Sequence, residues 1–220
     1  YLMGPEKISS HPAAKSAVKV FLTRPDTMLF LRTEELAVAW RSAFPEVPEA
    51  KIDVLPSLEL TEVTGIPDQP VSASELKFGV LGQVRPGKGI EWLVPLFDRN
   101  PQVGTLTVAG AFSNQQNEQD LAVLHAHPNF INGFLAEDEL VDLARYQHYL
   151  LMLYDNWDAR MEAAILYLAA KVNRPVIVRD GGWCGRMVRA YNCGIVCEKG
   201  NETVDFFLAL PKPGDDNYAA

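Results

Sequence analysis

The sequence predicts an α/β fold in which a parallel β-sheet carries helices on both of its faces. Two observations support this prediction. Short apolar runs with the composition of buried strands, such as Phe78–Leu81, recur along the chain from about residue 76 onward. Stretches with helical spacing of apolar residues separate these runs. Strands that alternate with helices of about 10–15 residues form βαβ units, which bring the strands together in one parallel sheet.

The first 55 residues contain a shorter set of elements. The apolar composition of Val18–Leu22 and Thr27–Leu31 indicates two strands. Thr33 is a good N-cap because its side-chain oxygen can accept a hydrogen bond from the first turn, so a helix is expected from there to Phe44. Prolines end this helix, and Lys51–Leu55 is expected to be a strand.

Residues 56–74 have the composition of a linker. Prolines, serines and threonines are frequent there, and Gly65 adds a flexible position. Domain boundaries fall in such segments. We therefore predict a partial domain with its linker over residues 1–70 and a complete α/β domain over residues 71–220.

The second part alternates regularly between strands and helices. Its strands are expected at 78–81, 105–109, 129–131, 149–154, 175–179 and 194–197. Its helices are expected at 90–99, 118–125, 137–146, 159–171, 184–190 and 203–210.

The loops that follow five of these strands are expected to form one ligand-binding edge, because parallel sheets bind ligands beyond the carboxyl ends of their strands. Four of the five loops contain glycine, which favours a phosphate or nucleotide site. The loops are Gly82–Gly89, Gly110-Ala111, Gly133-Phe134, Tyr154–Asp158 and Asp180–Gly185.

The loop Gly82–Gly89 is the strongest candidate for an anion site. It joins a strand to a helix N-terminus, where backbone N–H groups and the helix dipole favour negative charge. Arg85 can bind a phosphate bidentately, and Lys88 adds a point charge. The spacing matches neither a Walker loop nor the dinucleotide fingerprint. On this stretch alone, a surface turn with two cations is an equal alternative.

The composition and the length of the apolar runs argue against two classes of protein, general nucleic-acid binders and membrane-spanning proteins. With 48% hydrophobic and 22% charged residues, the 220-residue chain is typical of a globular protein. Its net charge of −8 argues against a general nucleic-acid binder, which shows a basic face. Apolar runs such as Tyr149–Tyr154 are far shorter than the ~18 residues that span a bilayer. We expect a cytoplasmic protein, with peripheral attachment to the inner membrane face left open.

The three cysteines predict neither a disulfide framework nor a metal centre. Cys184, Cys193 and Cys197 are an odd number and lie among apolar residues, which is typical of reduced thiols in a core. Zinc is not expected, because no second cluster of Cys or His accompanies them. No metal site and no cofactor are therefore predicted.

The order of these motifs resembles the second Rossmann-like domain of GT-B glycosyltransferases of the large retaining family 4. Each of the following segments falls where that domain has its counterpart: Gly82–Gly89, Leu106–Gly110, His127–Phe134, Glu137–Leu140, Arg174–Ile177, Asp180–Gly182 and Gly194–Val196. The resemblance covers roughly residues 77–200. Residues 33–56 resemble the last helix and strand of the preceding, acceptor-side domain.

The resemblance implies a nucleotide-diphosphate-sugar donor of the UDP or GDP type, used as a substrate rather than as a cofactor. It places Gly82, Arg85, Gly87 and Lys88 on the diphosphate. It also places Gly133 and Phe134 near the base, and the loop Tyr154–Asp158 near the sugar and ribose. The nearest carboxylates that could bind sugar or ribose hydroxyls are Asp155, Asp158 and Glu162, and a solvated helix N-terminus is an equal alternative for Asp155 and Asp158. Trp157 and Trp183 either stack on a sugar or pack in the core.

Two departures from the family pattern weaken the catalytic part of this expectation. The usual arginine after the first glycine is Gln83, so Arg85 must take its place. Counting back from Pro175 puts Arg160 and Leu168 at the positions of the family's paired glutamates, and neither is acidic. No catalytic residue is therefore assigned.

The sequence is interpreted as the donor-binding half of a hexosyltransferase. That enzyme would move a sugar from the nucleotide donor to a glycan, a lipid-linked or a small-molecule acceptor in polysaccharide biosynthesis. Two alternatives stay open: a non-catalytic nucleotide- or phosphosugar-binding module, and a Rossmann-like interaction domain without a ligand. The expected protein partner is an N-terminal domain, either on a separate chain or missing from this sequence.

Overall fold

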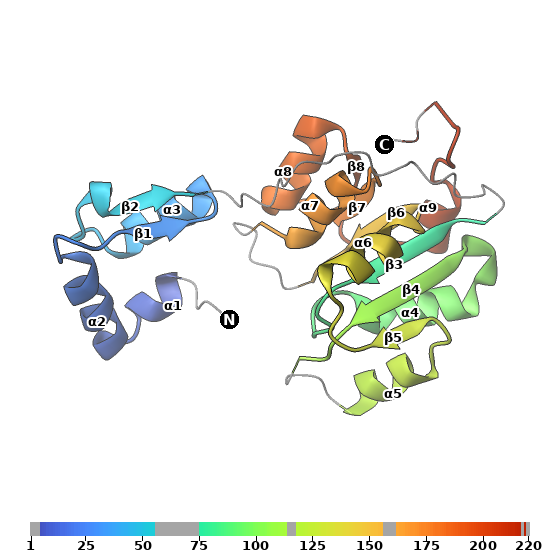
Figure 1. The fold of residues 1–220 in the computed structure, drawn as a ribbon, viewed down its shortest axis with the longest axis horizontal. Helices are drawn as coiled ribbons and strands as arrows, with labels where there is room; N and C mark the ends of the chain where they lie inside the picture. Colours follow the sequence, from blue (N-terminus) through green and yellow to red (C-terminus); the bar gives the residue numbers. More distant parts are fainter. Residues whose placement is uncertain (1–4, 56–74, 114–117, 156–161, 217, 219–220) are drawn as a thin grey trace. The chain divides into compact units, whose positions relative to one another are not determined.

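A computed structural model describes residues 5–55, 75–113, 118–155, 162–216 and 218 of the chain (Figure 1). The chain divides into two compact units, which are described separately. The smaller unit comprises residues 1–59 with 160–162, and the larger comprises residues 60–159 with 163–220. The predicted linker and the exact boundary at residue 70 lie outside the described residues. Among the residues described, none of the helices is long and apolar enough to cross a membrane.

The smaller unit packs helices against two short parallel strands. Its strands pair with Leu29 opposite Ile52. Its core includes Trp40, which stacks on Phe44 with ring centroids 5.2 Å apart. As predicted, the Thr33 side chain caps the third helix by accepting a hydrogen bond from the Leu36 N–H at 3.2 Å. The elements are α1 (Pro5–Ser9), α2 (Pro12–Leu22), β1 (Leu29–Leu31), α3 (Glu34–Ala43), η1 (Glu49–Lys51) and β2 (Ile52–Val54).

One strand prediction in this unit is wrong. Residues Val18–Leu22 are the last turns of helix α2 and not a strand. The apolar run is too short to separate a strand from a buried helical turn by its pattern alone. The deciding signal lies upstream, where Pro12 occupies the first turn, a position that suits its fixed φ and missing N–H.

The larger unit contains the predicted parallel sheet, with six strands in the order β5-β4-β3-β6-β7-β8. All five pairs of neighbouring strands are parallel. The strands are β3 (Lys77–Leu81), β4 (Thr105–Gly110), β5 (Phe130–Asn132), β6 (Tyr149–Met152), β7 (Val176–Arg179) and β8 (Gly194–Cys197).

Helices cover both faces of this sheet, as the sequence predicts (Figure 1). Side chains alternate along each strand, so Phe78 and Val80 of β3 pack on one face and Leu81 packs on the other. The helices α4, α5 and α9 contribute to the first core, and α6, α7 and α8 contribute to the second. The helices are α4 (Ile90–Arg99), η2 (Pro101–Val103), α5 (Glu118–Ala126), α6 (Glu137–Arg145), α7 (Ala164–Lys171), α8 (Gly182–Tyr191) and α9 (Val204–Leu208).

Helices α7 and α8 begin at other residues than the sequence predicts. Helix α7 begins at Ala164, because Ala163 before it has extended dihedral angles, and not at residue 159. Residues 159–161 lie outside the described residues. Helix α8 begins at Gly182, two residues before the predicted start at Cys184, because glycine residues set its first turn and give little helical signal in the sequence.

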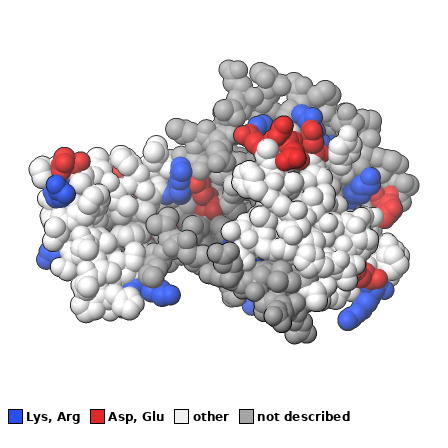
Figure 2. Space-filling model, turned by 60° about the horizontal axis from the view of Figure 1, so that its bottom comes forward, with Lys and Arg blue, Asp and Glu red and all other residues white. Residues whose placement is uncertain are grey.

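Charged side chains are mixed on the face of the molecule that Figure 2 shows. Most acidic side chains lie there beside lysine or arginine side chains, in small groups separated by uncharged surface. The described residues on this face show no continuous basic stripe.

Candidate functional site

The strand order of the larger unit marks one point of its carboxyl edge as the candidate ligand site. Chain order runs outward from β3 through β4 to β5 on one side, and through β6, β7 and β8 on the other. The connections that follow β3 and β6 therefore run toward opposite edges of the sheet, although the two strands, and the starts of their loops, are neighbours. Ligands of doubly wound sheets bind at such a switch point. The two loops that meet there are Gly82–Gly89 and the segment 153–155.

Glycine residues allow these loops to approach each other closely. The Asp155 N–H donates a hydrogen bond to the Gly87 carbonyl oxygen at 2.7 Å, which joins the two loops. Gly89 has φ of +78°, and a Cβ atom there would lie 2.6 Å from the Leu153 carbonyl oxygen. Only glycine adopts this angle readily and leaves room for that oxygen.

The loop after β4 joins the same edge. The Val84 N–H donates to the Ala111 carbonyl oxygen at 2.8 Å. A Cβ atom on Gly110 would lie 2.0 Å from the Gly82 carbonyl oxygen, so this contact also depends on glycine. Three loops from three neighbouring strands thus form one hydrogen-bonded group.

The two cations of the glycine loop are buried rather than displayed on the surface. Arg85 is 8% exposed and Lys88 is 6% exposed. The Lys88 ammonium group donates a hydrogen bond to the Leu81 carbonyl oxygen at 3.0 Å. Both cations lie near the face of the Tyr154 ring, with Arg85 Cζ 6.0 Å and Lys88 Nζ 5.8 Å from its centroid. Cation–π attraction therefore helps to hold them at this place.

Burial shifts the pKa values of Lys88 and Tyr154 in this cluster. Desolvation and, to a smaller extent, repulsion from the nearby Arg85 together lower the pKa of Lys88 to about 7. Burial also raises the pKa of Tyr154, so its hydroxyl keeps its proton at neutral pH. A bound polyanion would offset both effects on Lys88 and restore its charge. Perturbed groups of this kind are concentrated at functional sites.

Arg179, at the end of β7, links the segment after β6 to the segment after β8 through ion pairs. Its guanidinium group forms ion pairs with Asp155 and Glu202 and lies 5.7 Å from the centroid of the Trp92 ring. Burial lowers the pKa of Arg179, but its hydrogen bonds to the two carboxylates outweigh this effect and raise it. Arg179 thereby fixes the position of Asp155 beside the glycine loop.

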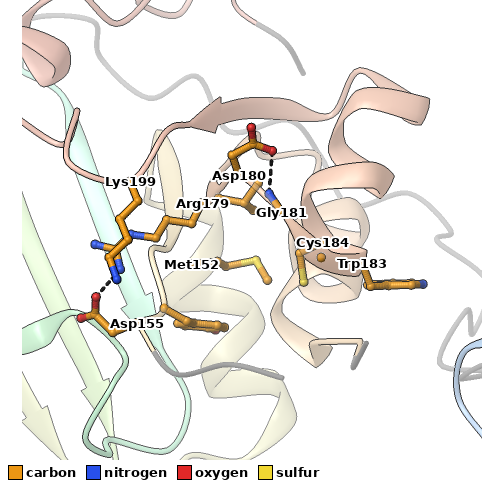
Figure 3. A pocket seen from close by; sticks show the side chains of 11 residues that line it. Met152, Asp155, Arg179, Asp180, Gly181, Trp183, Cys184 and Lys199 are labelled. Atoms are coloured by element: carbon orange, nitrogen blue, oxygen red, sulfur yellow. Dashed lines mark hydrogen bonds and ion pairs between the residues drawn. The ribbon is translucent and has the colours of Figure 1, made fainter. Parts of the chain in front are cut away.

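A cavity of about 210 Å³ opens beside Asp155, between the ends of β6 and β7 and the first turn of α8 (Figure 3). Its wall includes Tyr154, the residue on which the two cations pack. The residues that line it are Met152, Tyr154, Asp155, Val178, Arg179, Asp180, Gly181, Gly182, Trp183, Cys184 and Lys199.

The structure brings together five of the residues that the sequence analysis assigns to the site. Gly82, Arg85, Gly87, Lys88 and Asp155 lie around the switch point.

The other four assigned residues lie elsewhere or outside the described residues. Gly133 and Phe134 follow the edge strand β5, and the side chain of Phe134 is 89% exposed. Glu162 belongs to the smaller unit, where its carboxylate lies 3.5 Å from Arg32 Nε. Asp158 lies outside the described residues, as does Trp157.

Arg179 and Lys199 are polar residues of this edge that the sequence analysis does not assign. A signal for Arg179 exists in the sequence, because it is the only charged residue of the strand run Val176–Arg179 and stands at the carboxyl end. Lys199 follows β8 and carries no such local signal. Its place at the cavity becomes apparent only when β8 is paired with β7.

The fold of this chain is similar to that of several solved glycosyltransferase structures. The chain resembles WaaG, a glycosyltransferase involved in lipopolysaccharide biosynthesis, with a TM-score of 0.62 and 13% identity over 85% of this chain and 53% of that one. It resembles Anabaena HepE, solved in complex with UDP-glucose, with a TM-score of 0.62 and 13% identity over 94% and 60% of the two chains. It also resembles the trehalose-6-phosphate synthase OtsA, with a TM-score of 0.59 and 14% identity over 94% and 56%.

The chain has the Rossmann-like fold of GT-B glycosyltransferases. It spans a little over half the length of these solved structures. No protein-family model matches the chain, and no curated protein sequence matches it either. At 13–14% identity the likeness concerns the fold, so the function is argued from the site.

Proposed function

We propose that the chain is the donor-binding part of a retaining GT-B glycosyltransferase of the family 4 type. The donor is a nucleotide-diphosphate sugar of the UDP or GDP type. The acceptor is a glycan, a lipid-linked sugar or a small molecule, and residues 1–70 belong to the acceptor side. One observation carries the proposal: two buried cations, Arg85 and Lys88, lie at the topological switch point of a parallel sheet.

The position of these cations suits a diphosphate leaving group. Negative charge grows on the diphosphate as the bond to the sugar breaks, and fixed positive groups in a dry site stabilise that charge. Arg85 supplies two parallel N–H donors, and Lys88 gains a proton as the anion approaches. In this proposal the two side chains supply the charge stabilisation, and no metal ion takes part.

The ligands of the similar structures support the choice of donor. Anabaena HepE is solved in complex with UDP-glucose, and a trehalose-6-phosphate protein from E. coli is solved with UDP-2-fluoro glucose. Both proteins share the fold of this chain, with TM-scores of 0.62 and 0.61. We carry the UDP-sugar donor over as a hypothesis on this basis.

A non-catalytic nucleotide- or phosphosugar-binding module is the second candidate. It is favoured by Leu168, which stands where the family resemblance expects a glutamate and packs against the core of the larger unit. Arg160 stands at the other expected position and lies outside the described residues. A degenerate paralogue or a partner subunit would keep the donor site and lack these acidic groups.

Binding of nucleotides tests the proposal. Calorimetric titration of the full chain with UDP, GDP, UDP-glucose and GDP-mannose is expected to detect binding with one base type. Arg85→Ala should weaken it by at least about tenfold, because a charge-assisted hydrogen bond contributes about 1.5–3 kcal/mol. The matched control is Arg186→Ala, which changes an exposed arginine on the outer side of α8. If no nucleotide binds, or if both variants weaken binding equally, the proposal is wrong.

A second measurement separates the two candidates. Sugar release from the donor, by transfer or by slow hydrolysis, is followed by chromatography of the nucleotide product. Release that Arg85→Ala abolishes supports the enzyme. Binding without release in the presence of glycan and lipid-linked acceptors supports the non-catalytic module.

A further inference from the structure

Asp155 carries a carboxylate directly beside the two cations of the glycine loop. Its backbone N–H donates a hydrogen bond to the Gly87 carbonyl oxygen at 2.7 Å, and Gly87 precedes Lys88 in the chain. The residue before Asp155 is Tyr154, whose ring lies near both Arg85 and Lys88. A carboxylate in this position is an internal anion that could pair with either cation, because opposite charges attract strongly in a site with little water.

In the structure the Asp155 carboxylate pairs with Arg179 instead (Figure 3). Among the residues that the structure describes, Arg179 is the group to which this carboxylate is hydrogen-bonded. The side chain of Asp155 is 32% exposed, so packing alone leaves it room to turn. The ion pair therefore decides the direction in which the carboxylate points.

Arg179 is itself fixed by contacts on its other sides. It forms an ion pair with Glu202, whose side chain is only 7% exposed and accepts a hydrogen bond from the Gly200 N–H at 2.7 Å. Its guanidinium group also lies 5.7 Å from the centroid of the Trp92 ring, in the first turn of α4. A buried, hydrogen-bonded carboxylate holds a guanidinium group firmly. Arg179 is thus the fixed member of its pair with Asp155, and Asp155 is the movable one.

We propose that Arg179 is a positioning residue, which holds the Asp155 carboxylate away from Arg85 and Lys88 and so keeps these cations available to an anionic ligand. The inference rests on the proposed function for the nature of that ligand, a diphosphate. Without Arg179, the Asp155 carboxylate turns toward the glycine loop and competes with the ligand for the two cations. Arg179 therefore acts on binding through Asp155 and not by a contact of its own with the anion.

Calorimetric titration of the full chain with inorganic pyrophosphate tests this role. Arg179→Ala should weaken binding by at least about tenfold, because the ligand must first displace Asp155 from charge-assisted hydrogen bonds with the cations. Arg179→Ala combined with Asp155→Asn should restore the affinity to within about threefold of that of the natural chain, because the amide carries no charge and the two changes are coupled. Unchanged binding in Arg179→Ala, or a double variant that binds as weakly as Arg179→Ala, would overturn the inference.

A matched arginine variant controls for the loss of one positive charge. Arg189→Ala removes another arginine, which pairs with Asp180 at 2.8 Å and is 55% exposed. It should change the affinity for pyrophosphate by less than about twofold, because salt screens exposed charges. An equal loss in Arg189→Ala would mean that net charge explains the effect of Arg179→Ala, which contradicts the inference.

A second set of variants covers the case in which Arg179→Ala does not fold. That variant leaves the buried Glu202 carboxylate without its ion-pair partner, which is strongly destabilising. If circular dichroism shows unfolding, the comparison is made with Arg179→Gln and Glu202→Gln together, which remove the buried pair as a whole. The same loss of pyrophosphate binding, and the same recovery on addition of Asp155→Asn, are expected, and a loss without recovery overturns the inference.

Pyrophosphate and nucleotides together keep this inference separate from the proposed function. Pyrophosphate binding with the expected recovery, but without binding of any nucleotide or nucleotide sugar, supports the role of Arg179 and contradicts the proposed donor. Nucleotide binding that Arg179→Ala weakens and Asp155→Asn does not restore leaves the proposed function standing and overturns the inference. The inference is also overturned if neither the natural chain nor the Asp155→Asn variant binds pyrophosphate or a nucleotide.

Discussion

Lys88 is the residue at which the stability of the fold and its proposed function oppose each other. Its ammonium group is buried beside a second cation, and its pKa falls from 10.5 to about 7 as a result. A buried charge without a full counter-charge lowers stability. A binding site can require such a group, because a desolvated cation interacts more strongly with an anionic ligand than an exposed one does.

We predict that Lys88→Met stabilises the protein in a manner that depends on pH. The folded pKa of Lys88 lies below its unfolded value of 10.5, so the unfolded chain binds more protons between about pH 7 and pH 10.5. The stability of the natural chain therefore rises with pH across this window, and the cost of burying Lys88 is complete below it. Removal of the charge should raise the free energy of unfolding by about 1–4 kcal/mol at or below pH 7.

Urea unfolding at several pH values checks this prediction. The gain from Lys88→Met should shrink steadily as the pH rises from 7 toward 10.5. The exposed Lys212→Met is the control, and its effect should stay within about 0.5 kcal/mol at every pH. A destabilised Lys88→Met protein, or a gain that does not vary with pH, would contradict the assigned burial.

At the level of elements, the regular part of the chain could be predicted from its pattern. Helix α4 and strand β8 have the predicted bounds of Ile90–Arg99 and Gly194–Cys197. Glycine and proline mark the ends of such segments, and the strand runs are too apolar to lie at a surface. Helix α2 could not be predicted from its apolar residues, because Val20 and Phe21 are more than half exposed and do not mark a core position.

The candidate site could be predicted only in part, because some of its residues form a local motif and others meet only in the folded chain. The sequence places Arg85 and Lys88 in a short glycine loop, and the strand order brings that loop to the switch point. Their burial against Tyr154 depends on contacts between β3 and β6, which are about seventy residues apart in sequence. Arg179 meets its two carboxylate partners only because three segments, which follow three different strands, come together in the fold. A linear motif does not contain this information.

Glycine 89 is predicted to be essential for joining the glycine loop to the end of β6. Gly89→Ala introduces a Cβ atom 2.6 Å from a backbone oxygen at a φ of +78°, so either the loop or β6 must move. We expect a loss of about 3 kcal/mol in the free energy of unfolding and weaker nucleotide binding. Gly185→Ala, in the middle of α8, meets its nearest atom at 3.4 Å and should change stability by less than about 1 kcal/mol. Similar losses for both variants in thermal unfolding would contradict this argument.

At the scale of the whole molecule, the two units contain separate cores. The cores on the two faces of the six-stranded sheet consist of residues from the larger unit, and the core of the smaller unit consists of residues between Ile8 and Val54. The glycine loop, the two loops that it contacts and the cavity all belong to the larger unit. Under the proposed function, donor binding would be assigned to the larger unit alone.

This division predicts that residues 75–220 fold and bind nucleotide without the smaller unit. A domain of roughly 150 residues buries enough surface to be stable alone, and both faces of its sheet are covered by its own helices. The fragment should unfold cooperatively in circular dichroism, and its affinity for the preferred nucleotide should be within about threefold of that of the full chain, because distant parts contribute independently. Arg85→Ala in the fragment is the internal control and should remove the binding. A folded fragment that fails to bind a nucleotide bound by the full chain would show that the smaller unit or residues 56–74 supply part of the donor site, and the assignment of that site to the larger unit would be wrong.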